Sequence, residues 1–291
     1  MNDFLKKIIA GRREVIGRAK KTIPLADLQK AAKARRPARS LLARLQSNPV
    51  GNRANIIAEM KRASPSEGAL CPDLDPAKLA REYEKTGAAA ISVLTEPKYF
   101  LGRDEDIQKA RKAVKIPILR KDFTVDPWQV YQSAVLGADV ILLIVAALEP
   151  PVLKELYAAA CEARLETIIE VHTLPELEIA LQFQNAIIGV NNRNLATLKT
   201  DLSVARELAG YIPKERIVIA ESGIKNRSDI EQLMGVGYRG FLIGTSLLKA
   251  KSPGAALAEL IGATRMPAKT RSPPASLEAR RTLRKEKIFE L

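Results

Sequence analysis

Short apolar runs rich in β-branched residues recur along most of the chain, at spacings of roughly 20 to 35 residues. Most of them are continuously apolar and do not alternate with polar residues, as expected for strands that are buried on both faces. This pattern predicts eight strands, at Asn55–Ala58, Ala90–Leu94, Ile116–Leu119, Val140–Ile144, Thr167–Val171, Ile187–Val190, Ile217–Ala220 and Gly240–Ile243.

Helix start and stop signals lie between the predicted strands. Gly87 and Gly137 stand where a helix ends, just before the next strand. Eight strand–helix units predict a single (β/α)8 TIM barrel in the α/β class. A doubly wound open sheet is the alternative, and the lack of Gly-x-Gly-x-x-Gly after the first strand argues against it. Three helices are predicted to begin with a capping residue and a proline, at Asp75-Pro76, Asp126-Pro127 and Ser252-Pro253.

Two further segments flank the predicted barrel, which we assign to residues 49–264. Residues 1–48 are predicted to form a helical extension that packs on the barrel and keeps a basic outer face. Residues 265–291 form a basic tail, either flexible or helical. The apolar residues at near-helical spacing near the start of the extension are Phe4, Leu5, Ile8, Ile9, Val15 and Ile16.

The net charge of +14 comes from these flanking segments. Residues 1–48 have a net charge of +10 and residues 265–291 of +5, which leaves −1 for the barrel. Proteins that read nucleic acid usually hold their charge on the folded surface, so we expect neither nucleic acid nor a membrane as a partner. The alternative is weak binding of nucleic acid or anionic membrane through the basic ends, which predicts a steep salt dependence.

The number of cysteines and the length of the apolar runs indicate in which compartment the protein works. Cys71 and Cys161 are too few and too far apart for a disulfide framework or a zinc site. The first residues form no secretory apolar region, and the longest apolar run, Val140 to Leu148, is about half a membrane span. We expect a cytoplasmic protein that acts as a monomer, with weak self-association or a pathway partner as alternatives.

Charged and polar side chains follow the predicted strands, at the place where a parallel barrel holds its active site. Lys61 and Lys121 each come directly after a buried run, where an ammonium group loses its hydration. A lysine pair of this kind predicts a site for an anionic substrate. The polar residues expected to converge on one mouth are Glu59, Lys61, Ser64, Thr95, Glu96, Lys121, Glu170, Asn191, Arg193, Glu221, Ser222, Gly223, Gly244 and Thr245.

The turns after the last two strands contain small residues, Ser222-Gly223 and Gly244-Thr245. Small residues let backbone N–H groups approach an anion, and barrel enzymes often bind phosphate at these two turns. The sequence therefore predicts a phosphate site there. The alternative is that the glycines only permit tight turns.

Glu170 lies near the end of the fifth predicted strand, and His172 comes directly after that strand. Because the strand is strongly apolar, burial is expected to raise the pKa of Glu170 and make the carboxylate a usable proton acceptor. We expect His172, the only histidine, to point away from Glu170 and to have a structural role. Without a second His or a Cys cluster, no metal centre is expected.

These motifs together resemble the indole-3-glycerol-phosphate synthase family. The likeness runs in order from about residue 4 to residue 263 and leaves out the basic tail. The matching segments are Ala58–Lys61, Ala63–Ser66, Ser92–Glu96 with Tyr99-Phe100, Leu119–Phe123, Leu142–Ile144, Glu170–His172, Gly189–Arg193, Ala220–Ile224 and Phe241–Gly244.

The resemblance implies a carboxy-lyase of tryptophan biosynthesis that needs no metal or organic cofactor. Its substrate is an anionic sugar phosphate, 1-(2-carboxyphenylamino)-1-deoxyribulose 5-phosphate. Ring closure with loss of carbon dioxide and water gives indole-3-glycerol phosphate. By similarity, Lys121 is the general acid, Glu170 transfers protons in the dehydration, and Lys61 holds anionic groups and shares in proton transfer.

The resemblance also implies roles for the remaining site residues. By similarity, Glu59 and Asn191 orient the sugar chain and the lysines, Ser64 and Arg193 contact the substrate, Phe100, Phe123 and Leu142 line an aromatic pocket, and Ser222, Gly223, Gly244 and Thr245 hold the phosphate.

Another phosphate-binding barrel, such as a sugar-phosphate isomerase, is the nearest alternative function. Such enzymes lack the combination of Lys61, Lys121 and Glu170.

Overall fold

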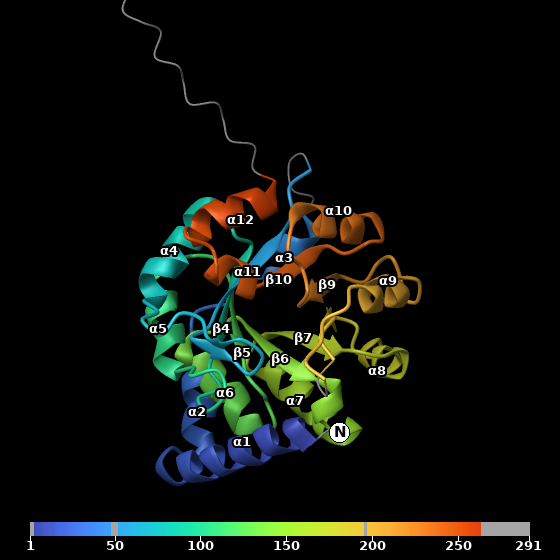
Figure 1. Cartoon of the computed structure of the whole chain (residues 1–291). Coiled ribbons are helices and arrows are strands. Elements are labelled where there is room, and N and C mark those ends of the chain that lie inside the picture. Colours follow the sequence, from blue (N-terminus) through green and yellow to red (C-terminus); the bar gives the residue numbers. More distant parts are fainter. Residues whose placement is uncertain (1–2, 48–51, 195–196, 263–291) are drawn as a thin grey trace, which may run out of the picture.

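The computed structural model describes residues 3–47, 52–194 and 197–262. Its principal strands are β1 (Ile56–Met60), β4 (Ala90–Leu94), β5 (Ile118–Lys121), β6 (Val140–Ile144), β7 (Glu166–Val171), β8 (Ile187–Asn191), β9 (Val218–Glu221) and β10 (Gly240–Ile243). They form a closed parallel barrel in the order β1-β10-β9-β8-β7-β6-β5-β4 (Figure 1). The predicted (β/α)8 barrel is therefore confirmed, and an open doubly wound sheet is excluded.

Helices surround the barrel and cover the outer faces of its strands (Figure 1). A short hairpin, β2 (Ala63–Ser64) with β3 (Gly68–Ala69), follows β1 and was not predicted. The helices are α1 (Asp3–Thr22), α2 (Leu25–Lys33), α3 (Leu41–Gln46), α4 (Pro76–Thr86), α5 (Asp104–Ala113), α6 (Pro127–Leu136), α7 (Pro150–Glu162), α8 (Leu174–Ala180), α9 (Ser203–Ala209), α10 (Arg227–Gly235), α11 (Thr245–Leu248) and α12 (Pro253–Ile261), with a 3₁₀ turn, η1 (Val145–Ala147), after β6.

The predicted helix boundaries agree with the capping contacts. The side chain of Asp75 accepts hydrogen bonds from the first turn of α4, Asp126 does so for α6, and Ser252 for α12. Gly87 and Gly137 close α4 and α6 with left-handed φ values of 105° and 100°. A residue with a Cβ atom is strained in that conformation, which explains a glycine at both helix ends.

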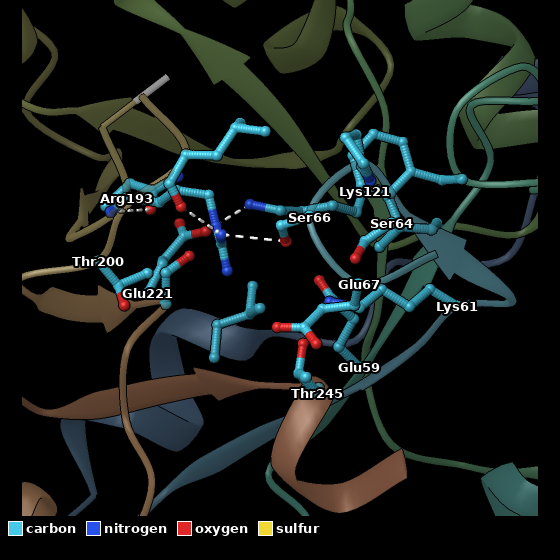
Figure 2. A pocket seen from close by; sticks show the side chains of 18 of the residues that line it. Glu59, Lys61, Ser64, Ser66, Glu67, Lys121, Arg193, Thr200, Glu221 and Thr245 are labelled. Carbon is cyan, nitrogen blue, oxygen red and sulfur yellow. Dashed lines mark hydrogen bonds and ion pairs between the residues drawn. The ribbon is translucent and has the colours of Figure 1, made fainter. Parts of the chain in front are cut away.

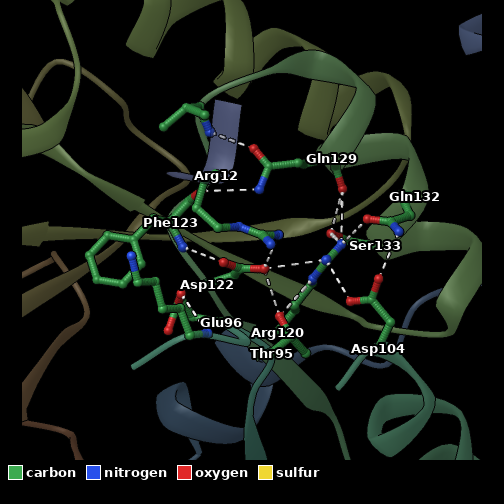
Figure 3. A network of polar contacts seen from close by, with 12 residues as sticks. Arg12, Thr95, Glu96, Asp104, Arg120, Asp122, Phe123, Gln129, Gln132 and Ser133 are labelled. Atoms are coloured by element: carbon green, nitrogen blue, oxygen red, sulfur yellow. Dashed lines mark hydrogen bonds and ion pairs between the residues drawn. The ribbon is translucent and has the colours of Figure 1, made fainter. Parts of the chain in front are cut away.

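Strand β5 begins and ends two residues later than predicted, because its charged residues belong to the strand. Arg120 is almost fully buried, yet its guanidinium is neutralised by Asp104 at 2.8 Å and Asp122 at 3.3 Å. Thr95 and Ser133 also bind it, which completes a buried polar network (Figure 3). A charged side chain can be buried in a strand when it is paired and hydrogen-bonded. A prediction based on apolar runs therefore ends such a strand too early.

The N-terminal extension contacts both ends of the barrel. Helices α1 and α2 lie beside α6 (Figure 1), and the start of α1 reaches the mouth at the carboxyl ends of the strands. Leu41 and Leu45 of α3 are buried, and the backbone of α3 binds the carboxylate of Glu166 at the start of β7. Val15, expected on the packed face of α1, is 42% exposed instead, while Ile16 is buried.

Three arginines of the extension bind groups of the barrel domain. Arg12 of α1 forms a buried ion pair with Asp122 at 2.7 Å. Arg35 donates to the carbonyl of Ala138 at the end of α6, and Arg39 donates to that of Val114. These arginines hold the extension on the barrel, so the predicted basic outer face does not account for all of its charge. The basic tail, residues 265–291, lies outside the described residues.

Candidate active site

A cavity of about 410 Å³ opens at the carboxyl ends of the strands (Figure 2). This size is in the usual range for a small-molecule site. The structure brings all fourteen proposed site residues together in its walls, although they are spread over nearly 190 positions. They are Glu59, Lys61, Ser64, Phe100, Lys121, Phe123, Leu142, Glu170, Asn191, Arg193, Ser222, Gly223, Gly244 and Thr245.

Lys121 lies in the centre of the site, between two carboxylates from other strands. Its Nζ donates to Glu170 Oε2 at 3.0 Å and also to Glu221 Oε2. Burial opposes the charge of this lysine, but Glu170, Glu221 and Glu59 outweigh that effect and raise its pKa. Lys121 is therefore protonated in the resting site and can give a proton only to a group that develops strong basicity.

Glu170 has a lower pKa than an ordinary glutamate, which is the opposite of the direction expected from the sequence. Burial favours the neutral form, as predicted, but the charges of Lys121 and His172 outweigh it. Hydrogen bonds from Lys121 and Asn191 act in the same direction. The prediction was wrong because an apolar strand pattern does not reveal which cations face its last carboxylate.

Glu221 is the carboxyl group of the site whose pKa is raised. Burial, together with the negative charges of Glu170 and Glu59, raises it to about 7 despite the neighbouring Lys121. Its second oxygen, Oε1, has no hydrogen-bond partner among the described residues. Glu221 ends a predicted strand in the sequence, yet no site role was assigned to it. The sequence pattern that could have indicated a site role for Glu221 is the one used for Glu59, an acidic residue directly after an apolar predicted strand.

Lys61 and Glu59 form a second acid–base pair at the end of β1. Their Nζ and Oε1 atoms are 2.5 Å apart, and both side chains are largely buried. Gly244 allows this placement, since a Cβ atom there would come within 3.0 Å of the Cβ of Glu59. The glycine in the turn after β10 therefore serves a neighbouring side chain as well as the turn itself.

Tight turns at the cavity follow the last two strands, β9 and β10. Ser222 and Gly223 both adopt left-handed φ, at 65° and 79°. The side chain of a larger residue at 223 would also press against Thr200. After β10, helix α11 begins at Thr245, so its first N–H groups lie at the cavity. Backbone N–H groups at the start of a helix carry partial positive charge, which favours an anion.

Two cross-mouth contacts hold the β2–β3 hairpin over the cavity. Arg193, after β8, donates to Ser66 at 3.2 Å (Figure 2). Lys249, after α11, pairs with Glu67 at 2.5 Å. Ser64 also lies in the hairpin and lines the cavity. The hairpin therefore forms one wall of the site rather than a loose loop.

Part of the lining of the cavity is apolar. The rings of Phe100 and Phe123 lie 6.4 Å apart, centre to centre, and Leu142 lines the same cavity. Leu5 and Ile8 of α1 also line it, which the sequence did not predict. Their spacing showed only that one face of α1 packs on the barrel and could not show where on the barrel it packs.

His172 was expected to point away from Glu170, and the structure contradicts this. Its Nε2 lies 3.5 Å from Glu170 Oε1, and its Nδ1 lies 3.3 Å from Glu176 Oε2. Residues two apart in a strand share a face, so this orientation follows from ordinary strand geometry.

Comparison with known proteins agrees with this geometry. The family model described as indole-3-glycerol phosphate synthase matches residues 5–260. The chain belongs to the indole-3-glycerol phosphate synthase family. It is 44% identical to the indole-3-glycerol phosphate synthase of Carboxydothermus hydrogenoformans, over 89% of this chain and 99% of that protein. The Azospirillum brasilense protein of the same name is 41% identical, over 90% of this chain and 100% of that protein.

Membership of the indole-3-glycerol phosphate synthase family makes the chain a carboxy-lyase of tryptophan biosynthesis. Solved structures at low identity share the barrel alone. They include KGPDC from Streptococcus mutans, with a TM-score of 0.56 at 16% identity, covering 72% of this chain and 95% of that one. Thiamine phosphate pyrophosphorylase from Pyrococcus furiosus has a TM-score of 0.53 at 18% identity, and the match covers 72% of this chain and 94% of that one. Within the described ranges, no helix is long and apolar enough to cross a membrane.

Proposed function

We propose that the cavity converts 1-(2-carboxyphenylamino)-1-deoxyribulose 5-phosphate into indole-3-glycerol phosphate, carbon dioxide and water. The observation that carries the proposal is the position of Lys121 between Glu170 and Glu221, in a cavity that has an apolar wall and two anion-binding turns. This arrangement offers a proton donor, proton acceptors and separate places for an aromatic ring and a phosphate.

The apolar lining and the two turns support one direction of substrate binding. Its phosphate is held by the turns at Ser222-Gly223 and Gly244-Thr245, where backbone N–H groups are available. Its aromatic ring packs against Phe100, Phe123 and Leu142. Arg193, Ser64 and Lys61 then lie along the substrate and hold its polar groups, including the carboxylate.

Lys121 is the general acid for ring closure. Its Nζ gives a proton to the ketone oxygen as the ring carbon attacks, so negative charge does not build up on that oxygen. When this proton leaves, Lys121 no longer lowers the pKa of Glu170, which lies 3.0 Å away. Glu170 then becomes a stronger base at the stage when a carbon of the new ring must lose its proton.

Glu59 and Asn191 orient the reacting groups. Glu59 holds Lys61 at 2.5 Å, and Asn191 binds Glu170 while its Oδ1 accepts from the backbone N–H of Arg193. Lys61 also shares in proton transfer. Glu59 stands near the end of β1 and Asn191 at the end of β8, so a rigid barrel sets their spacing.

The direct test is an assay with purified protein and the anthranilate-derived substrate. Indole fluorescence should appear together with release of carbon dioxide, in equal amounts. A Lys121→Met variant provides the control, because it keeps the length of the side chain and removes the proton. Absence of fluorescence with wild-type protein would reject the proposed reaction.

The proposal extends to the state and setting of the enzyme. We propose that it acts in the cytoplasm and that a monomer suffices for activity, which is supported by a cavity whose proposed site residues are together within one chain. Sedimentation at active concentrations would test this, and a dimer as the only active species would contradict it. Binding of nucleic acid or anionic vesicles through the basic ends is the other outcome to test, by its steep dependence on salt.

A further inference from the structure

Three side chains form a line that leads outward from the cavity. Glu170 of β7 is 3% exposed, His172 just after β7 is 12% exposed, and Glu176 of α8 is 21% exposed. The roles proposed above use Glu170 only. His172 is the single histidine of the chain.

Glu176 fixes the position of His172 through two contacts. Its Oε2 accepts from the backbone N–H of His172 at 2.7 Å and lies 3.3 Å from Nδ1. The ring is therefore turned so that Nε2 faces Glu170 Oε1 at 3.5 Å. That Nε2 is buried and has no hydrogen-bond partner among the described residues. A shift of a few tenths of an ångström would complete a bond to Glu170.

Each carboxylate oxygen of Glu170 thus faces a nitrogen atom of a different residue. Lys121 binds Oε2, and His172 faces Oε1. In the proposed cycle Lys121 loses its charge after it protonates the substrate. A buried carboxylate without a nearby cation would then take up a proton and lose its function as a base.

We infer that His172 is a positioning residue for Glu170: as an imidazolium held by Glu176, it keeps the Glu170 carboxylate ionised and oriented while Lys121 is neutral. This inference rests on the proposed function, because the neutral lysine arises only during that reaction.

The charges around His172 are consistent with an imidazolium. Burial opposes its charge, but the hydrogen bond to Glu176 and the negative charges of Glu170, Glu176 and Glu221 outweigh burial and raise its pKa. These groups come from β7, α8 and β9. Lys121 of β5 is the nearby cation, and it lies on the far side of Glu170.

The first test is nuclear magnetic resonance of untagged protein, in which one imidazole gives one unambiguous titration. We expect His172 to titrate above its ordinary pKa, and Glu176→Gln and Glu170→Gln each to lower that value. Glu178→Gln provides the matched control, since Glu178 is exposed on the same helix. A titration at or below about 6.5, or one unchanged in Glu170→Gln, overturns the inference.

The second test is the pH dependence of turnover in His172→Asn. We expect the acid limb of kcat to move upward by about one pH unit, the usual effect of losing one nearby cation. KM should stay within about twofold, because the histidine does not touch the substrate. An equal loss at every pH would indicate a merely structural role and overturn the inference. If the wild-type protein forms no product, the proposed function fails, and the resonance titration alone decides whether His172 holds Glu170.

Discussion

Gly189 of β8 leaves the space that the carboxylate of Glu221 occupies inside the barrel. A Cβ atom at position 189 would come within 2.8 Å of Ile168 and still closer to Glu221 Oε1. The φ angle of Gly189 is not in the left-handed region, so the backbone does not need a glycine. The requirement is for room beside a buried carboxylate that binds Lys121.

Gly189→Ala should therefore displace Glu221 and damage both stability and activity. Forcing a methyl group into a filled interior usually costs about 1–3 kcal/mol of unfolding free energy. Gly210→Ala is the matched control, because a Cβ atom there would meet nothing within 4 Å. Denaturant unfolding and kcat measure the two effects. If both variants behave like wild type, Gly189 has no such role.

Lys121→Met should lower kcat by about 10²-fold or more, the usual scale for a lost general acid. The methionine side chain keeps most of the packing, so stability should fall less than activity. Steady-state kinetics with the indole fluorescence readout measures the effect. Turnover within a few-fold of wild type would remove Lys121 from its proposed role.

The raised pKa of Glu221 predicts a pH dependence of stability. The unfolded chain ionises this group near its ordinary pKa, and the folded chain ionises it only near 7. The folded state therefore binds more protons in between, and its stability falls as the pH rises from about 5 to about 8. The change for this group is at most roughly 3 kcal/mol.

Glu221→Gln should flatten that part of the stability profile, since glutamine does not titrate. Urea unfolding at pH 5 and at pH 8, for wild type and variant, isolates the contribution of this carboxyl group. The same loss of stability in both proteins would show that another group is responsible.

Asp122→Asn should destabilise the fold by about 3–5 kcal/mol, because it leaves Arg12 buried without its carboxylate and removes one of the two carboxylates that neutralise Arg120. Glu14→Gln is the control, since Glu14 pairs with Arg18 on the exposed face of α1 and should contribute about 1 kcal/mol or less. Thermal and denaturant unfolding compare the two. Equal, small effects would mean that the buried network is not a significant part of stability.

Removing residues 266–291 should leave kcat and KM unchanged. The family likeness ends before this segment, and all of the proposed site residues precede it. Kinetics of the shortened protein provides the measurement. A large loss of rate would show that the tail belongs to the active enzyme.

The sequence predicted the architecture well because strands buried on both faces leave an unmistakable apolar pattern. All eight predicted strands exist, with ends shifted by no more than two residues. It also predicted most of the side chains that would meet, since the ends of strands in a closed barrel share one mouth. That rule alone predicts that Glu59, Lys121 and Glu170 lie in the same cavity.

Thr95 and Glu96, expected at the mouth as well, do not line the cavity. Thr95 binds Arg120 and Asp122, and Glu96 accepts from the backbone of the loop after β4.

What the sequence could not predict depends on distances between strands. The pKa of Glu170 is lowered because Lys121 and His172 both face it, and neither contact can be read from an apolar run. Strand β5 continued into Arg120 because partners from other elements neutralise that charge. The place of Leu5 and Ile8 in the cavity wall required the docking position of α1.

The contacts of the extension have a consequence for how the chain is made. Arg12 leaves the ribosome 110 residues before its partner Asp122, and β1 must wait for β10 before the ring of strands can close. Helix α1 can therefore be synthesised early but can dock only late. Contacts of such long sequence separation slow folding, so the nascent chain must keep the apolar face of α1 unattached until more than a third of the protein exists.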